Sequence, residues 1–353
     1  MKSNSEPRFE AWQVQEQDFP RKGSSADKLE FLIRYAILAP SGHNSQPWKF
    51  SVGEDEIQVL ADKTRWLRVG DPNQVNLHIA VGCALENLLI AAEHFGYGHQ
   101  VTYFPRPDQE ELVATVKFTP HEPAPSPRPK GTGSGAKGQP SPFRDPALLG
   151  AIPNRHTNRK AYEKRPIPKS DLRCLQNSCV EEGIWLHVID DLDTKRSVNE
   201  LLVRGHTTLI ANPAFRRESA YWLGQGLFNL SRLLTRLMQW ALPYLKVNRS
   251  VFVVMDTRLV MSAPALAILS ASVNDRMSQV KVGQVFERVC LTATMLGLCV
   301  HPLSGAVDVP ELKAQVAKLL PNSDVISQHV FRLGYAEPVK SPASRRPFEE
   351  VLV

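Results

Sequence analysis

The sequence of 353 residues has few cysteines, and their spacing argues against two kinds of site. The five thiols show no Cys-x-x-Cys pair; they are Cys83, Cys174, Cys179, Cys290 and Cys299. An odd number without paired spacing makes a disulfide framework or a zinc site a poor interpretation, and we expect no metal site. Reduced thiols that pack as small apolar side chains are expected instead, which favours a cytoplasmic protein.

Long apolar runs that suit a membrane are lacking as well. The uncharged stretch Leu259–Asn274 contains Pro264 and is shorter than the ~20 apolar residues of a membrane span. The first 23 residues carry charges throughout and have no apolar core of a signal peptide. We therefore expect a protein that is not exported and has no membrane partner.

The excess of one charge is small, with a formal net charge of +6. The basic residues are scattered rather than arranged in a stripe with aromatic ones, so nucleic-acid binding is not expected. A mild positive field suits an anionic cofactor or a small-molecule substrate. Hydrophobic residues make up 42% and charged residues 22%, as in ordinary globular proteins.

A segment rich in proline and glycine divides the chain. Residues 120–142 hold seven prolines and four glycines, and alanine is their largest apolar side chain. Such a segment cannot bury enough surface to offset the entropy of ordering it, which predicts a flexible linker between residues 25–119 and 143–353. Its GSGAKG run (133–138) matches the dinucleotide-binding pattern formally, but no strand precedes it and no helix follows, so we interpret it as a spacer.

Hydrophobic periodicity predicts helices and strands in both parts. The expected helices are 27–39 with Asp27 as N-cap, 76–95, 228–245 and 281–296. The expected strands are 46–52, 57–62, 101–105, 112–118, 185–190, 250–256, 265–272 and 329–336.

Two of the predicted helices resemble each other. VGCALENLLIAAEHFGYG (81–98) aligns without a gap on VGQVFERVCLTATMLGLC (282–299), with identical residues that include Gly82 and Gly283, Glu86 and Glu287, and the closing glycines. Both are apolar on nearly all faces, as expected for helices at the centre of an assembly. Any two buried helices share small residues, but the glutamates and glycines in register favour an internal duplication, and hence an intramolecular pseudo-dimer.

The segment APSGHNSQPWKF (39–50) is the first candidate site. A helix ends in a tight loop with small side chains and exposed backbone N–H groups, so a flat ring with polar edges can approach closely. Asn44 offers both a donor and an acceptor to such a ring. The pattern PSxxNxQPW resembles the flavin-binding loop of the nitroreductase family. This resemblance implies bound FMN, with Pro40, Ser41, Gly42 and Asn44 at the cofactor.

The second candidate site is IPNRHTNRKAY (152–162). Arg155, Thr157 and Arg159 place two guanidinium groups and a hydroxyl within five residues, which suits a phosphate. The run is similar to the family's RxSxR pattern with threonine in place of serine, and the resemblance assigns these residues and His156 to the phosphate of FMN.

Two later segments complete the resemblance. The tail SPASRRPFEEVL (341–352) is similar to the family's closing basic segment, which implies that Arg345 or Arg346 contacts the same phosphate. The loop HPLSG (301–305) resembles the loop that lies at the N5 and O4 edge of the flavin, which assigns Pro302, Leu303, Ser304 and Gly305 to the cofactor. His301 has no partner at metal-ligand spacing, so a structural role is expected for it.

The motifs are distributed unequally between the two parts. The first has PSGHN but neither the arginine clamp nor the PLSG loop, and the second has the reverse. The chain therefore resembles the Acg-like, fused double-domain branch of the nitroreductases, in which one polypeptide assembles one flavin site. The implied fold class is α+β: a nitroreductase-like fold duplicated in one chain, with antiparallel or mixed sheets flanked by helices and long buried central helices. Residues 206–250 form a candidate lid, with a plain packing helix as the alternative.

The resemblance implies an FMN-dependent oxidoreductase in which NAD(P)H and an acceptor, a nitroaromatic or a quinone, use the same pocket in turn. The hard chemistry belongs to the cofactor, so no side chain is expected to be catalytic as an acid or a base. The alternative is a non-catalytic protein that binds or stores FMN behind a lid. A general α+β interaction protein without cofactor is a weaker alternative. The sequence leaves the choice between NADH and NADPH open, and also whether chains associate further.

Overall fold

The structure is a computed structural model, and it describes residues 7–120, 143–227, 232–244, 257–339 and 341–353. Most of the expected linker (120–142), the expected strand 250–256 and parts of the expected helix 228–245 lie outside the described residues.

The first half is an antiparallel sheet with two principal helices. Its strands pair in the order β1-β2-β4-β3. In chain order the elements are α1 (Ser25–Ala36), β1 (Trp48–Val52), β2 (Glu56–Ala61), α2 (Val75–His94), β3 (Tyr97–Tyr103) and β4 (Leu112–Pro120). Short 3-10 helices are η1 (Pro7–Gln13), η2 (Glu16–Asp18), η3 (Gly42–Asn44) and η4 (Lys63–Arg65).

The second half contains another four-stranded antiparallel sheet, in the order β5-β6-β8-β7. Its strands are β5 (Ile184–Ile189), β6 (Ala265–Ala271), β7 (Cys299–Pro302) and β8 (Ile326–Gly334). Its helices are α3 (Leu148–Ala151), α4 (Lys169–Asn177), α5 (Leu192–Ala211), α6 (Pro213–Trp222), α7 (Arg232–Ala241), α9 (Arg276–Met295) and α10 (Pro310–Ala317), with short turns η5 (Ile152–Asn154), η6 (Leu223–Leu227) and η7 (Phe348–Glu350).

The two sheets have the same topology, which confirms the predicted duplication. In each half a long helix joins the second strand to the third, and the third and fourth strands pair. The ladder between the second and fourth strands even shifts register at a similar place, between Val59 and Leu60 and between Leu269 and Ser270. The sheets and the long helices therefore repeat as one α+β unit.

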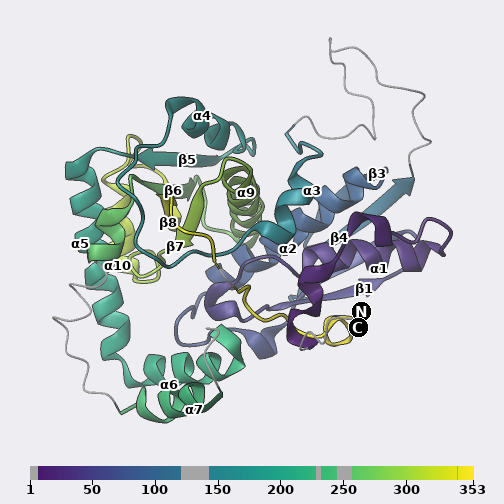
Figure 1. Ribbon diagram of the computed structural model, residues 1–353, viewed down its shortest axis with the longest axis horizontal. Coiled ribbons are helices and arrows are strands. Elements are labelled where there is room, and N and C mark those ends of the chain that lie inside the picture. The colour runs from purple at the N-terminus through teal and green to yellow at the C-terminus, as the bar shows by residue number, and fades with distance from the viewer. Residues whose placement is uncertain (1–6, 121–142, 228–231, 245–256, 340) are drawn as a thin grey trace.

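The long helices α2 and α9 cross at the centre of the molecule (Figure 1). A Cβ atom on Gly82 would overlap the carbonyl oxygen of Val280, and one on Gly283 would overlap that of Ile79. These positions are equivalent in the two halves, so the helices meet on a local twofold axis. Only glycine lets the backbones approach this closely. The hydrogen bond between His78 Nδ1 and Gln279 Oε1 (2.7 Å) joins another equivalent pair.

Local predictions needed small corrections at the ends of elements. Ser24, not Asp27, is the N-cap of α1, and Asp27 closes a capping box by accepting a hydrogen bond from the backbone N–H of Ser24 (2.8 Å). Helix α9 begins five residues earlier than expected, because Asp275 caps it. The gap between β5 and β6 holds α5, α6 and α7, so the insertion begins near residue 190 rather than 206.

The C-terminal tail crosses from the second half to the first. Leu352 forms a parallel bridge with Phe50 of β1, and the indole N–H of Trp12 donates to the carbonyl of Ala343 (2.7 Å). Figure 1 shows the C-terminus beside β1 of the first half. The tail thus ties the last residues of one half to an edge strand of the other.

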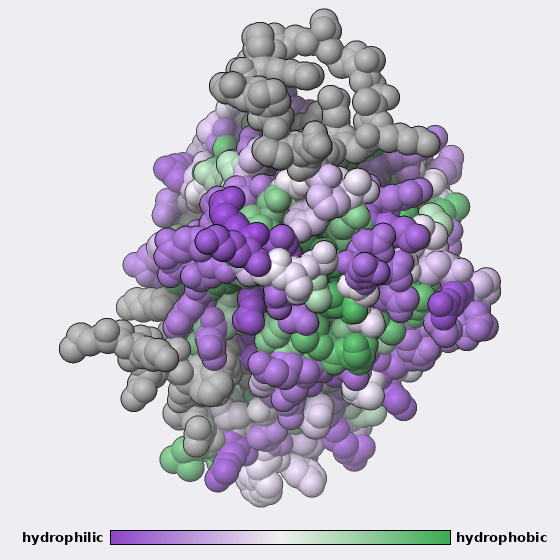
Figure 2. Space-filling model, turned by 90° about the vertical axis from the view of Figure 1, so that its right-hand side faces the viewer, coloured by the Kyte–Doolittle hydropathy of each residue, from purple (hydrophilic) through white to green (hydrophobic). Residues whose placement is uncertain are grey.

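Among the described residues, α2 is the one helix long and apolar enough to cross a membrane, and 89% of its apolar window is buried. This burial is that of a core helix. The face of the first half in Figure 2 is mostly hydrophilic, with hydrophobic side chains gathered near its middle.

Candidate functional site

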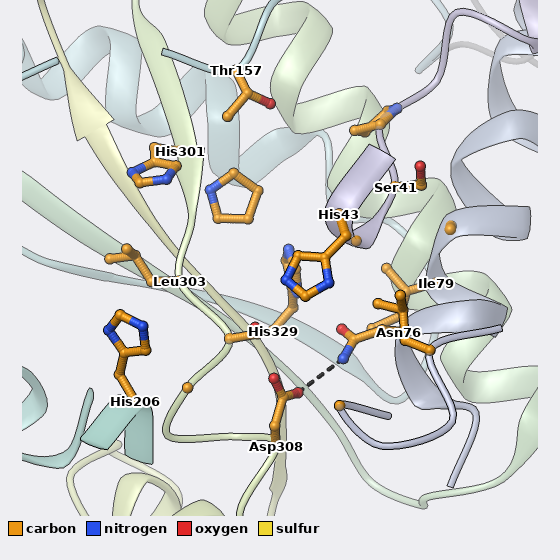
Figure 3. A pocket seen from close by; sticks show the side chains of 18 of the residues that line it. Ser41, His43, Asn76, Ile79, Thr157, His206, His301, Leu303, Asp308 and His329 are labelled. Atoms are coloured by element: carbon orange, nitrogen blue, oxygen red, sulfur yellow. Dashed lines mark hydrogen bonds between the residues drawn. The ribbon is translucent and has the colours of Figure 1, made fainter. Parts of the chain in front are cut away.

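A cavity of about 390 Å³ lies between the two halves, within the size range of cofactor and substrate sites. Its walls come from the PSGHN loop, α2, the segment 157–159, the insertion, the HPLSG loop, α9 and β8. Figure 3 shows His301, Leu303 and His206 on one side and Ser41 and Ile79 on the other. Segments far apart in the sequence therefore converge on one space.

The PSGHN loop forms one wall through Pro40, Ser41, Gly42 and His43. His43, Asn44 and Gln46 all have positive φ angles near 50°, which makes the turn tight. Ser41 Oγ accepts a hydrogen bond from the backbone N–H of Gln46 (2.9 Å) and holds the turn closed. The imidazole of His43 is thereby placed at the cavity.

The wall from the second half begins with Thr157 and Arg159. Thr157 forms a parallel β-bridge with Val300, and the backbone N–H of Asn158 donates to the carbonyl of Val300 (3.1 Å). This pairing fixes the segment against the strand that leads into the HPLSG loop. Among the described residues, Arg159 is the one arginine that lines the cavity. Burial lowers the pKa of its guanidinium group.

The HPLSG segment begins in the last two residues of β7, and all five of its residues line the cavity. Leu303 N–H donates to the carbonyl of Val330 (2.7 Å), which keeps the loop against β8. A Cβ atom on Gly305 would lie 3.0 Å from the backbone nitrogen of His206 and 3.2 Å from the oxygen of Leu202. Glycine at this position therefore lets the insertion pack on the loop.

The insertion supplies the outer wall. Leu202, His206 and Leu209 of α5 and Phe215 of α6 line the cavity. The Glu218 carboxylate accepts hydrogen bonds from the backbone N–H groups of Val69 (3.0 Å) and Gly70 (2.8 Å) in the first half. The Phe215 ring centroid lies 6.0 Å from that of His43. Residues of α5 and α6 thus line the cavity and contact the first half, whereas no residue of α7 is among the lining residues.

Arg345 is not among the residues that line the cavity, and its expected role at the phosphate stays a prediction. Its guanidinium is 4% exposed and lies 4.4 Å from the centre of the Trp12 ring. It donates to Asn44 Oδ1 (2.9 Å) and to the carbonyls of Leu38 (2.9 Å) and Ala39 (3.2 Å). Burial, and next the neighbouring Arg155, lower its pKa to about 9. Arg345 therefore ties the tail to the PSGHN loop.

Four other expected cofactor ligands also lie outside the cavity lining. Arg346 donates to the carbonyls of Gln46 and Trp48 and pairs with Asp62 (3.2 Å), and Asn44 Nδ2 donates to the carbonyl of Ser344 (3.0 Å). Arg155 approaches Glu287 at 3.6 Å, and the His156 ring packs edge-on against Trp12. Their contacts in the structure are with backbone carbonyls, carboxylates and the Trp12 ring, so these residues support the loop from behind.

Buried imidazoles distinguish the cavity. Burial lowers the pKa values of His43 and His329 to about 4, so both rings are neutral at ordinary pH. His43 Nδ1 and both ring nitrogens of His329 have no hydrogen-bond partner among the described residues. A buried polar atom without a hydrogen-bond partner is costly, so these ring nitrogens are unusual features of residues that line the cavity.

His301 has a defined tautomer. Arg332 Nε donates to its Nδ1 (3.0 Å), and a guanidinium does not lose its proton, so the remaining ring proton lies on Nε2. Burial and Arg332 lower the pKa of His301 well below its usual range. His301 thus offers a neutral N–H donor at the cavity wall, a role that the sequence did not reveal because Arg332 is 31 residues away.

One carboxyl group also reaches the cavity. Asp308 Oδ1 accepts a hydrogen bond from Asn76 Nδ2 (2.9 Å; dashed in Figure 3). Burial raises its pKa to about 6, and hydrogen bonds from Ser304 and Asn76 limit the rise. Asp308 can therefore release or take up a proton near neutral pH.

The equivalent position on the other side of the local twofold axis is filled. Tyr103 and Phe104 stand where the second half has Ser304 and Gly305, and Gln284 stands where the first half has Cys83. The Tyr103 hydroxyl donates to Gln284 Oε1 (2.7 Å), and the guanidinium of Arg276 lies 4.8 Å from the centre of the Phe104 ring. Side chains thus occupy the place of a second cavity.

Comparison with known proteins adds distant relatives across the whole length of the chain. No family model matches. The chain is 24% identical over 337 residues, covering 93% of it and 91% of the relative, to a Mycobacterium tuberculosis protein provisionally named NAD(P)H nitroreductase. It is 23% identical over 343 residues to the M. tuberculosis protein provisionally named NAD(P)H nitroreductase acg, covering 93% and 96% of the two chains.

Solved structures resemble parts of the chain. They include an FMN-dependent nitroreductase from Mycobacterium smegmatis in complex with NADPH (18% identity, 54% of this chain, 88% of that chain, TM-score 0.35). Another is an iodotyrosine deiodinase bound to FMN and 3-iodo-L-tyrosine (15% identity, 55% and 92%, TM-score 0.38).

Proposed function

The chain is a distant member of the nitroreductase family, and we propose that it is an FMN-dependent oxidoreductase that uses NAD(P)H to reduce nitroaromatic or quinone-like acceptors. The observation that carries the proposal is the convergence of the PSGHN loop, Thr157 with Arg159, and the HPLSG loop on one cavity. Each of these segments alone is compatible with an ordinary turn. Together they offer backbone groups, a cation and apolar surface to one ligand.

The cavity lining fits the parts of FMN. Pro40, Ser41 and Gly42 would hold one edge of the ring system, and Pro302 to Gly305 would hold another. Arg159 and Thr157 would bind the phosphate, since a guanidinium and a hydroxyl suit phosphate oxygens.

When bound, FMN supplies the hydride chemistry, and the chain supplies position, charge and exclusion of water. His301 holds an N–H donor at the wall through its bond with Arg332. Asp308 holds a proton at its carboxyl group that can be exchanged near neutral pH. Leu202, Leu209 and Phe215 cover the cavity with apolar surface and exclude water, which strengthens each polar interaction inside.

A flavin-storage protein is the second candidate function, and the insertion favours it. The contacts of Glu218 with Val69 and Gly70 close the cover against the first half. If these contacts persist, NAD(P)H and an acceptor cannot reach the cavity. The same lining would then retain FMN without turnover.

The two candidate functions can be distinguished by measurements on the purified protein. We expect flavin absorbance, and steady-state oxidation of NADPH or NADH in the presence of a quinone or a nitrofuran. A flavin that neither nicotinamide reduces would establish the storage function instead. A preparation that binds no FMN would refute both.

The variant Arg159→Met tests the revised phosphate ligand. Loss of a charge-assisted bond of ~1.5–3 kcal/mol predicts FMN affinity that is roughly 10- to 100-fold weaker in fluorescence titration. Arg196→Met on the exposed surface of α5 is the matched control and should bind as the wild type does. Undiminished affinity of Arg159→Met would remove the phosphate from this part of the cavity.

A further inference from the structure

Helix α7 (Arg232–Ala241) is amphipathic, but its apolar side chains point toward solvent rather than toward the rest of the protein. Leu233 is 81% exposed, Leu237 57% and Trp240 72%. An isolated exposed leucine is ordinary, whereas one continuous apolar helix face marks an interaction site. Leu234, Met238 and Tyr244 extend this exposed face.

The polar side of the same helix packs inward. Thr235 and Gln239 are only partly exposed, and Gln239 lies against Gly224 of η6. At 100° per residue these two positions lie opposite the middle of the apolar face. A helix that only packed on its own protein would turn its leucines toward that protein. The described residues therefore leave this apolar face without cover.

The positive charge of this region favours an anionic lipid surface over a second copy of the chain as the partner. From Ser219 to Met255 the sequence has four basic residues and no acidic one. Arg236 is exposed and lies beside Trp240 on the helical wheel. Two copies of this face would bring like charges together, which opposes self-association. A basic helix with leucine and tryptophan on its apolar side is typical of helices that lie in the interface of anionic membranes.

We propose that α7 docks on an anionic lipid surface, with its apolar face among the acyl chains and Arg236 at the headgroups. The lack of a membrane-spanning segment, from which no membrane partner was expected, does not bear on such surface docking. Helix α7 belongs to the same insertion that covers the cavity, so docking would bring the cover to the membrane.

The experiment is cosedimentation of the full chain with vesicles of phosphatidylcholine, with and without phosphatidylglycerol. We expect binding to the anionic vesicles that weakens as salt is added. The variant Leu233→Gln/Leu237→Gln/Trp240→Gln should bind at least about a hundredfold more weakly, since burial of one such side chain is worth about tenfold or more. Arg236→Gln should lose about fivefold on anionic vesicles only.

The matched control is Leu192→Gln, because Leu192 is 51% exposed at the start of α5, outside the proposed face. It should bind vesicles as the wild type does, and every variant should keep the wild-type unfolding midpoint. Failure of the wild type to bind anionic vesicles would overturn the proposal, as would undiminished binding by the triple variant. A dimer in sedimentation velocity that the triple variant abolishes would assign the face to a second copy instead, and would also overturn it.

Discussion

The crossing of α2 and α9 gives the sharpest test of the architecture. In Gly82→Ala the new methyl group would overlap the carbonyl oxygen of Val280 and lie 3.1 Å from the Cα of Gly283. In Gly283→Ala it would overlap the oxygen of Ile79 and lie 3.0 Å from the Cα of Gly82. The obstacles are backbone atoms, which cannot rotate away, so the helices must separate. We expect each variant to lose about 3 kcal/mol of unfolding free energy, the upper part of the range for overpacking.

The local twofold symmetry also predicts how the costs of the two substitutions compare. The two substitutions meet equivalent atoms, so their costs should be similar, and the double variant should cost less than the sum because one separation relieves both clashes. Urea unfolding followed by circular dichroism measures these values. Gly150→Ala is the control, since its Cβ would meet nothing within 4 Å in α3. A midpoint for Gly82→Ala equal to that of the wild type would refute the crossing.

Two further predictions concern the cavity. Burial lowers the pKa of His329 to about 4, so the folded state binds fewer protons than the unfolded state. The contribution of His329 to the free energy of unfolding is therefore complete above about pH 6.5, and it declines as the pH falls toward 4. In His329→Gln, the loss of unfolding free energy between about pH 6.5 and pH 4 should be smaller by on the order of 3 kcal/mol, as measured by urea titrations at a series of pH values. An unchanged dependence of the unfolding free energy on pH would contradict the assignment. Because Tyr103 and Phe104 fill the equivalent position, the flavin-to-protein ratio should approach one, and a ratio near two would contradict that closure.

The duplication was predictable because it depends on a local pattern, whereas the convergence of the motifs was implied by the resemblance to the nitroreductase family. Helices at the centre of a structure are apolar on all faces, so the match between 81–98 and 282–299 was visible without knowledge of the sheets. The topology of strands β1 to β4 and β5 to β8 then confirmed it. Tight loops of small residues can likewise be recognised in a sequence, and residues of the PSGHN and HPLSG loops line the cavity.

The arginines show where sequence reasoning ends. Arg155, Arg345 and Arg346 were expected at a phosphate, because clustered guanidinium groups suit phosphate oxygens. Backbone carbonyls and carboxylates accept the same hydrogen bonds, and the sequence does not say which of them a given arginine will meet. In the structure, Arg345 finds carbonyls of Leu38 and Ala39. The partners of Arg155, Arg345 and Arg346 in the structure were therefore not predictable from the sequence, and their roles at a phosphate stay predictions.

The cavity residues that were missed come from segments with no motif. Phe215, Asp308 and His329 are ordinary residues of helices, loops and strands until the chain folds. His301 was expected to be structural, because no partner was visible nearby, and in the structure Arg332 donates to its Nδ1 and so fixes the ring proton on Nε2. Long-range pairs of this kind lie beyond any local pattern.

Fusion of the two halves explains the asymmetry of the site. In a dimer of identical chains, every loop occurs twice, so a residue that closes one site closes both, and a cover over one site covers both. In one chain, β3 can continue to Tyr103 and fill its side of the axis, while β7 stops at Pro302 and opens into the HPLSG loop. The insertion between β5 and β6 has no counterpart between β1 and β2, where a turn at Gly53 suffices. The symmetric helices supply a rigid base, and the loops that depart from the symmetry make one covered cavity.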